Sequence, residues 1–126
     1  MNVYIAAPLF SEGERNFNES IDSIIRECGH TTFLPQRDGG CVADLPDQIN
    51  GIPKRKYLFQ LDCEHMDWCD AILFLYDGRV PDEGACIELG IAYAQGKRCY
   101  GLKTDTRTIQ LDLDNNPMIE GCFIRY

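Results

Sequence analysis

Carboxylic acids stand at three positions where a side chain of that type can carry out chemistry. Asp82 lies just before a predicted helix in the stretch PDEGACIELG, and Glu88 lies one turn inside that helix. Asp62 lies within another predicted helix, in the stretch FQLDCEH. Pairs of carboxylic acids perform glycosyl chemistry, in which one attacks an oxocarbenium-like carbon and the other moves the proton of the leaving group. We expect Glu88 to take the first role and Asp82 the second.

The position of Glu88 on its helix is unusual for a solvated acid. Helical spacing places it on one stripe with Ala85, Leu89 and Ala92, and such a stripe normally faces the sheet. A carboxylate near a helix N-terminus can stay ionised while it is partly desolvated, because the helix dipole and the free N–H groups favour the anion. This reasoning predicts that Glu88 is a nucleophile.

The neighbours of these acids fit a ligand at the helix start. Gly84 and Ala85 are small and leave room for close approach. Tyr4, on the first predicted strand, is expected to hold the Glu88 carboxylate by its hydroxyl. For Asp82 the ordinary alternative is a helix N-cap, and the sequence leaves both interpretations open.

The sequence signals neither a metal nor a cofactor. The histidine nearest to the acids is His65 in DCEHMDWC, where Met66 and Trp68 indicate a packed helix face rather than a ligand set. There is no serine elbow, no GxGxxG and no P-loop, so no nucleotide cofactor is expected.

The composition of the chain excludes some classes of binding partner and indicates a cellular compartment. With 126 residues and a net charge of −8, the chain is expected to form one domain over residues 1–126 and not to bind a nucleic acid polymer. No apolar run reaches the ~18 residues of a membrane span, so no membrane partner is expected. The chain enters a strand without a basic signal region, and its seven cysteines are odd in number and lack CxxC spacing. These features predict a cytoplasmic protein with reduced thiols.

Strand-like and helix-like segments alternate along the chain. Strands are predicted at residues 2–7, 30–35, 71–76, 97–104 and 121–126, and helices at 11–28, 54–69 and 85–95. The order predicts a doubly wound (flavodoxin-like) α/β domain with a mostly parallel five-stranded sheet flanked by helices. Ligands collect at the carboxyl ends of strands in such sheets, and the long polar connection after Pro35 is the kind of loop that is often functional.

Five stretches, in chain order and over nearly the whole chain, resemble the nucleoside 2-deoxyribosyltransferases. They are VYIAAPLF, LPQRDG, QLDCEHMDWCDAILFLYDG, PDEGACIELGIAYAQGKRCYGLKTD and NNPMIEG. The most specific part is an acid followed after five residues by Glu-Leu-Gly-x-Ala and then by Gly-Lys.

The resemblance implies an enzyme that moves a 2-deoxyribosyl group between nucleobases through a covalent sugar–enzyme intermediate. Its partners would be deoxynucleosides and free nucleobases, with a role in nucleotide salvage. Glu88 matches the nucleophile of the family, Asp82 and Asp62 match the acids that contact or protonate the base, and Tyr4 matches the tyrosine that orients the nucleophile.

The resemblance also implies substrate-binding residues and an assembly. Phe10 and Gln36 fall on the base-binding side, and Gly84 gives clearance. Asn116 matches an asparagine that a neighbouring subunit lends to the sugar 5′ end, which implies a homo-oligomer with shared active sites. A second apolar edge on the third helix is formed by Ile87, Ile91 and Ala94, and the sequence leaves open whether it is an interface or ordinary core.

Two other functions remain open from the sequence. One is an N-glycosidase that hydrolyses a 2′-deoxynucleoside 5′-monophosphate, for which Ser11 and Gly13 are candidate phosphate ligands. The other is a nucleotide-binding module without turnover, since α/β domains of this size serve many purposes.

Overall fold

The computed structural model describes residues 1–40, 42–105 and 116–124. The strands are β1 (Asn2–Ala6), β2 (Thr31–Phe33), β3 (Gln48–Ile49), β4 (Ile52–Pro53), β5 (Ala71–Leu75) and β6 (Arg98–Leu102). The helices are α1 (Glu12–Glu27), α2 (Pro35–Asp38), a 3₁₀ turn (Val42–Asp44), α3 (Lys54–Trp68), α4 (Glu83–Ala94) and α5 (Pro117–Glu120). The predicted helices and the first four predicted strands are therefore confirmed, within a few residues at their ends.

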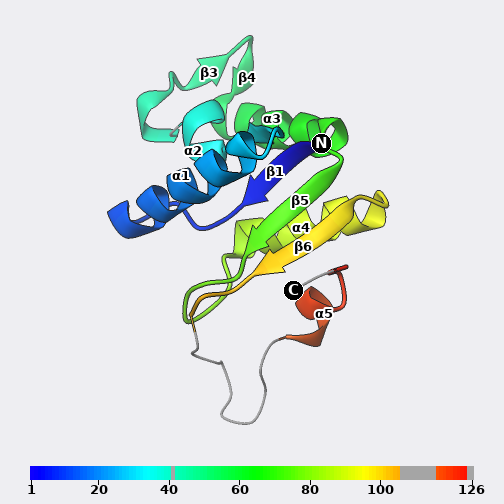
Figure 1. The fold of residues 1–126 in the computed structure, drawn as a ribbon. Coiled ribbons are helices and arrows are strands. Elements are labelled where there is room, and N and C mark those ends of the chain that lie inside the picture. Colours follow the sequence, from blue (N-terminus) through cyan, green and yellow to red (C-terminus); the bar gives the residue numbers. More distant parts are fainter. Residues whose placement is uncertain (41, 106–115, 125–126) are drawn as a thin grey trace.

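Four strands form a parallel sheet in the order β2-β1-β5-β6. Figure 1 shows β1, β5 and β6 side by side. The chain runs from β1 to β2 on one side and then crosses to β5 on the other, so the strand order reverses at β1. This is the doubly wound arrangement that the sequence predicts. A ligand crevice is expected outside the carboxyl ends of β1 and its neighbours, because the flanking loops diverge there.

Within the described residues the main sheet has four strands and not the predicted five. Residues 121–126 were expected to form the last strand, but Gly121 caps α5 and the chain continues as a turn. A short approach to β6 follows, where the Ile124 N–H donates to the Cys99 carbonyl at 2.8 Å. The N–H groups of Gly121 and Cys122 bond back to the carbonyls of Pro117 and Ile119 in α5, so these residues close the helix end and do not start a strand. Residues 125 and 126 lie outside the described part.

The long connection after β2 contains structure that the sequence analysis did not predict. β3 and β4 form a small antiparallel hairpin, separate from the main sheet. Its turn is Asn50–Gly51, with both residues at positive φ (52° and 80°). Asn-Gly is the dipeptide that two-residue hairpin turns prefer, since both central residues must have positive φ. This dipeptide was the signal that could have revealed the hairpin.

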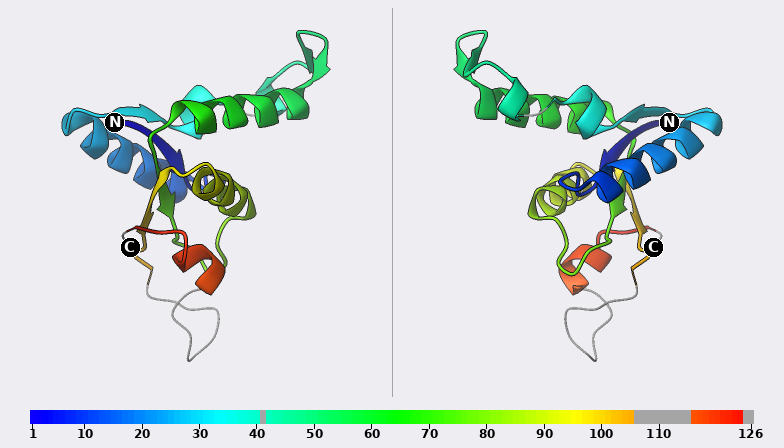
Figure 2. Two further views of the ribbon diagram at one scale, coloured as in Figure 1. Left: turned by 90° about the vertical axis from the view of Figure 1, so that its right-hand side faces the viewer. Right: turned by 90° about the vertical axis from the view of Figure 1, so that its left-hand side faces the viewer.

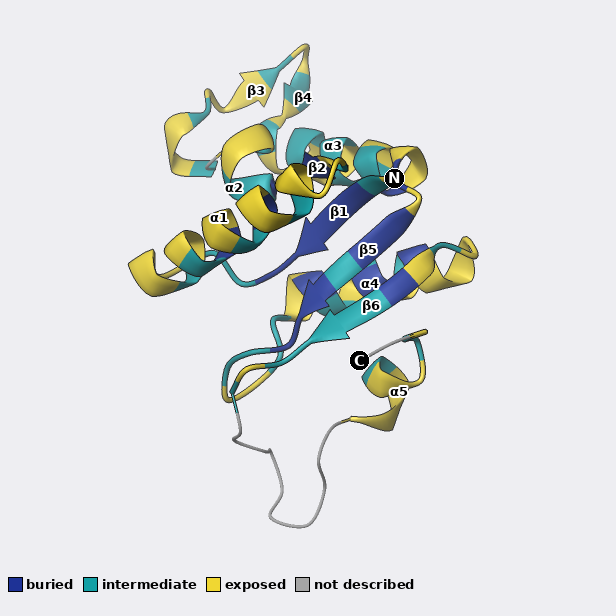
Figure 3. Cartoon of the chain, viewed as in Figure 1, coloured by how far each residue is buried: buried dark blue, intermediate teal, exposed yellow. Residues whose placement is uncertain are grey.

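Helices cover both faces of the sheet (Figure 2). Alternate residues of β1 point to opposite sides: Tyr4 and Ala6 belong to the core that includes Ala85 and Leu89 of α4, whereas Ile5 packs on the α1 side. β1 and β5 are the most deeply buried strands (Figure 3), as expected for central strands covered on both faces. Among the helices of the described residues, none is both long and apolar enough to cross a membrane.

Candidate active site

A pocket of about 190 Å³ lies at the predicted rim, where the loops after β1 and β2 meet α3 and α4. It contains both Asp62 and Glu88 together with Asp82, so the structure brings together the three acids that the sequence singled out. The remaining lining residues are Ala7, Leu9, Phe10, Pro35, Gly39, Gly40, Leu58 and Gly84. An acidic cluster inside an otherwise apolar lining is a setting in which carboxylates titrate abnormally.

Glu88 projects into this pocket from α4, one residue before the buried Leu89. Burial, together with the charge of Asp62, raises the pKa of Glu88 from its usual 4.5 to about 8. The expectation that the helix N-terminus would keep this carboxylate readily ionised is therefore wrong. Glu88 lies beyond the first turn, where the helix dipole acts most strongly, and loss of water outweighs that effect.

Asp62 faces the same pocket from α3. Burial raises the pKa of Asp62 from 3.8 to about 6, and the nearby His65 opposes part of this rise. His65 itself stacks on Phe33 with ring centroids 3.9 Å apart, and its Nδ1 lies 2.8 Å from the Leu61 carbonyl. These contacts hold the imidazole as part of the packed helix face that the sequence suggested.

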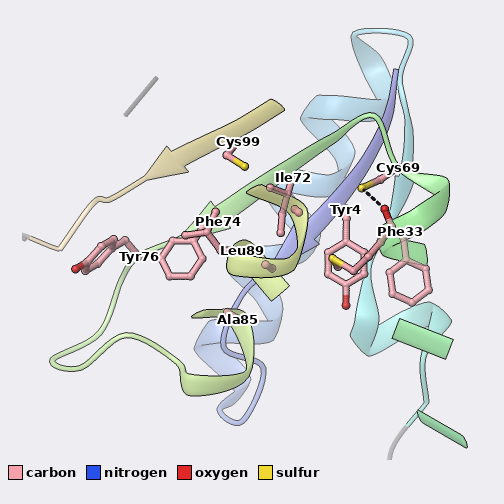
Figure 4. Close-up of a cluster of buried hydrophobic side chains, with 12 residues drawn as sticks. Tyr4, Phe33, Cys69, Ile72, Phe74, Tyr76, Ala85, Leu89 and Cys99 are labelled. Carbon is pink, nitrogen blue, oxygen red and sulfur yellow. Dashed lines mark hydrogen bonds between the residues drawn. The ribbon is translucent and has the colours of Figure 1, made fainter. Parts of the chain in front are cut away.

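Tyr4 lies under the two acids on the central strand. Its ring stacks on Phe33 at 5.0 Å between centroids, within the cluster drawn in Figure 4. Among the described residues, its hydroxyl is the buried side-chain oxygen that lacks a well-formed hydrogen bond. It lies near enough to favour the Glu88 carboxylate and so offsets part of the rise in the pKa of Glu88, while burial and the charge of Glu88 raise the pKa of Tyr4.

Asp82 has a structural task at the pocket edge. It is the N-cap of α4, and its Oδ2 accepts a hydrogen bond from the Ala85 N–H at 2.9 Å. This is the ordinary alternative that the sequence left open, although Asp82 also lines the pocket. A β-carbon at Gly84 would lie 3.3 Å from this oxygen, so a glycine there keeps both the cap and the pocket free of crowding.

The predicted substrate-binding residues divide into two groups. Phe10 and Gly84 line the pocket, and Phe10 is 75% exposed at its edge. Gln36 is turned toward α1, where its Nε2 donates to the Arg15 carbonyl at 2.9 Å. Asn116 caps α5 by accepting from the Met118 N–H at 2.9 Å. Neither Gln36 nor Asn116 lines the pocket of its own chain.

Sequence reasoning missed several lining residues that carry no chemistry of their own. Leu58 lies one turn before Asp62 on α3, so helical spacing from the acid could have found it. Gly39 and Gly40 follow the short helix α2 and contribute backbone to the lining. Within the described residues, no group of three or more His, Cys, Asp or Glu side chains is arranged to hold a metal ion.

Comparison with known proteins identifies the family of this chain. The family model described as nucleoside 2-deoxyribosyltransferase matches residues 3–120. The chain belongs to this family. Membership confirms the resemblance that the sequence motifs indicated, and it makes the chain a member of an enzyme family that acts on nucleosides and nucleobases.

Solved structures of similar fold agree with membership of the nucleoside 2-deoxyribosyltransferase family. A 2-deoxyribosyltransferase of Bacillus psychrosaccharolyticus is 26% identical, with a TM-score of 0.76 over 100% of this chain and 85% of that one. A 2-desoxiribosyltransferase of Leishmania mexicana (21% identity, TM-score 0.66, 94% and 84% covered) shares the fold.

A CMP N-glycosidase of Clostridium botulinum also shares the fold (19% identity, TM-score 0.65, 100% and 89% covered). No curated protein matches the sequence. The family model and the Bacillus psychrosaccharolyticus structure support an enzyme of the deoxyribosyltransferase type, whereas the N-glycosidase shows the shared fold alone.

The raised pKa of Glu88 predicts a dependence of stability on pH. Because its folded pKa, about 8, exceeds the usual 4.5, the folded state binds this proton more tightly than the unfolded state does. The resulting stabilisation is complete below 4.5 and is lost as pH rises through about 8. Glu88→Gln, which mimics the protonated acid, should therefore raise the melting temperature above pH 8 and change it little near pH 4.5.

Thermal unfolding across this pH range tests the prediction. Glu83→Gln is the matched control, because Glu83 is an exposed acid in the first turn of the same helix. Its loss should slightly lower the melting temperature by removing a favourable charge near the helix N-terminus. If Glu88→Gln changes the melting temperature equally at low and high pH, burial of the ionised carboxylate does not destabilise the fold.

Proposed function

We propose that the protein transfers a 2-deoxyribosyl group between nucleobases through a covalent intermediate on Glu88. The observation that carries the proposal is the pairing of two desolvated carboxyl groups, Glu88 and Asp62, in one pocket with apolar walls. Two carboxyl groups with raised pKa values in a shared site supply both a nucleophile and a proton donor.

The reaction takes place in two displacements. In the first, a Glu88 oxygen forms a bond to C1′, and the electron pair of the C1′–N bond passes to the departing base, which takes up a proton. In the second, a nitrogen of the incoming base attacks C1′ and releases Glu88. Each displacement inverts the anomeric carbon, so the product retains the starting configuration.

The two acids supply the required proton as a pair. Between the pKa of Asp62, about 6, and that of Glu88, about 8, the pair holds one proton. Attack requires this proton on the donor and the negative charge on Glu88. A nucleoside whose base accepts a hydrogen bond from Asp62 favours that distribution, and the Tyr4 hydroxyl favours the Glu88 anion.

Asp62 suits the role of proton donor better than Asp82 does. One Asp82 oxygen is already engaged as the helix cap, where it accepts the Ala85 N–H at the start of α4. Burial instead favours the protonated form of Asp62. In this proposal Asp82 holds the helix start and contacts the base, while Asp62 moves the proton.

The start of α1 favours a nucleoside over a nucleotide as substrate. Ser11 and Gly13 were the candidate phosphate ligands for a nucleotide hydrolase. In the structure Ser11 forms a capping box with Glu14, whose Oε1 accepts the N–H groups of Phe10 at 3.1 Å and Ser11 at 2.8 Å. These N–H groups already bind a carboxylate, which would also repel a phosphate.

We also propose a homo-oligomer with shared active sites. α4 carries exposed apolar residues on its outer side, Ile87 at 62% and Tyr93 at 57%, and Met118 on α5 is 82% exposed. Apolar residues on all sides of a helix are typical of a helix that is buried, and a second copy would bury this one. Asn116 does not line the pocket of its own chain, and in this proposal it contacts the sugar bound by another copy. The roles in salvage and in the cytoplasm stay predictions.

Substitution of Glu88 tests the covalent step. Glu88→Ala should lower base exchange by at least ~10³-fold, because the nucleophile is lost. A 2-fluoro-2-deoxynucleoside should leave a trapped sugar on Glu88 in the wild type, detected by peptide mass spectrometry, and none in the variant. Release of the trapped sugar by an added base faster than by water supports transfer over hydrolysis. Full activity of Glu88→Ala, or an adduct on another residue, would refute the assignment.

Leaving groups that need no proton separate the two aspartates. Asp62→Asn should slow exchange of ordinary bases by ~10²–10⁴-fold and have little effect on release of a p-nitrophenolate from its 2-deoxyriboside. Asp82→Asn should slow both substrates alike. If Asp82→Asn spares the p-nitrophenolate substrate and Asp62→Asn slows both substrates, the proton donor is Asp82.

The pH dependence of the wild-type kcat/KM should be bell-shaped, with limbs near the pKa values of about 6 and 8.

Mixing two inactive variants tests the shared site. Glu88→Gln and Asn116→Ala should each be inactive alone, because each lacks one part of every site. After reversible dissociation and mixing, about a quarter of wild-type activity should return, since half of the pairs are mixed and each has one intact site. If native mass spectrometry shows mixed oligomers and activity is not restored, the two residues are not supplied to one site by different chains.

A further inference from the structure

Helix α1 carries two polar side chains on its buried side. Asn18 is 2% exposed and Asp22 is 5% exposed, and they lie one turn apart. In the described part of the chain, Thr32 of β2 is the remaining buried polar residue. Polar groups in such positions cost free energy unless they are bonded, so their partners show what they hold in place.

Asp22 binds the segment that follows β2. One of its oxygens accepts the Thr32 hydroxyl, and the other lies 2.7 Å from an Arg37 guanidinium nitrogen. The same guanidinium donates to both Asp38 oxygens, at 3.0 and 2.8 Å. Asp38 in turn accepts the Leu34 N–H at 2.9 Å. Arg37 therefore ties α1 to α2 by a fork of donors that fits two carboxylates at once.

Asn18 binds the segment that follows β1. Its Nδ2 donates to the Pro8 carbonyl at 2.9 Å and to Gln36 Oε1 at 3.0 Å. Gln36 then donates to the Arg15 carbonyl of α1. This explains why Gln36 is turned away from the pocket. The loops after β1 and β2 are both attached to helix α1 and, through Asn18, to each other.

These attachments end next to residues that line the pocket. Pro8 lies between the lining residues Ala7 and Leu9, and Arg37 lies between Pro35 and Gly39. A β-carbon at Gly39 would lie 2.8 Å from the Pro35 carbonyl oxygen, so α2 closes too tightly to accept any other residue without shifting. The positions of these lining residues therefore depend on the hydrogen bonds of Asn18 and Arg37.

The wall that these loops form has no group that could react. Its members are apolar residues and glycines: Ala7, Leu9, Phe10, Pro35, Gly39 and Gly40. The acids come from α3 and from the start of α4. A flat apolar wall suits the face of a nucleobase, and its placement affects binding of the base more than bond breaking at C1′.

We propose that Arg37, bridging Asp22 and Asp38, is a positioning residue that sets the nucleobase wall of the pocket. The proposal rests on the proposed function, because it assigns the wall to the base of the nucleoside. Loss of the bridge should weaken binding of every base and leave the chemical step intact. A residue that served stability alone would change the melting temperature without changing affinity.

Three arginine variants test the proposal. Arg37→Met removes the bridge, and Arg37→Lys keeps a charge for Asp22 but cannot hold Asp38 at the same time. The matched control is Arg26→Met, because Arg26 is an exposed residue whose guanidinium lies 3.8 Å from the same Asp22 oxygen. Binding of adenine and cytosine is measured by calorimetry, together with KM, kcat and melting temperature.

Both Arg37 variants should raise the dissociation constant and the KM by about tenfold, with kcat within about twofold of the wild type. Arg26→Met should match the wild type. If Arg37→Met does not fold, Arg37→Lys decides alone. Unchanged affinity in a folded Arg37 variant, or a fall in kcat equal to the rise in KM, would overturn the positioning role. A wild type that binds no base and forms no adduct would overturn the proposed function as well.

Discussion

The parallel pairing of β1 with both β2 and β5 is the constraint on which the site depends. The register sets Tyr4 beside Phe33 on one side and Ile72 on the other. The strand order reverses at β1, so the connections that leave β1 and β5 run to opposite faces of the sheet. The pocket lies between them, and Tyr4, at the centre of the sheet, lies beneath its acids.

Desolvation is the effect that gives the acids their chemistry. A helix N-terminus favours an anion, and that argument suggested an ionised Glu88. The structure shows the opposite balance, since burial and the neighbouring Asp62 raise the pKa of Glu88 to about 8. The pair consequently holds a proton at neutral pH, which a leaving nucleobase needs, and the protein gives up folding stability to keep both acids out of water.

Two buried polar residues on α1 hold the loops that line the same pocket. Asn18 and Asp22 take positions on α1 that an apolar residue would fill at lower desolvation cost. Their hydrogen bonds fix two loops whose pocket-lining residues are small or apolar. In this arrangement one face of the sheet carries the reactive groups, and the helix on the other face holds the wall opposite them.

Much of this protein is determined by sequence features that act locally. The apolar runs and helical spacing identified β1, α1, α3, β5, α4 and β6, because hydrophobic periodicity reports which face of each element is buried. The stripe that Glu88 shares with Leu89, and the motif around it, indicated the acids and the family. The signal for the β3–β4 hairpin, the dipeptide Asn50–Gly51, is also a local feature, but the sequence analysis did not use it.

Only the tertiary structure decided what depends on contacts between distant segments. It showed the cap formed by Asp82, the turn of Gln36 toward α1 and the absence of Asn116 from the lining of its own pocket. The proton balance between Asp62 and Glu88 was likewise invisible in the sequence. A pKa depends on how much water surrounds a group and which charges stand near it, and both follow from packing residues far apart in the chain.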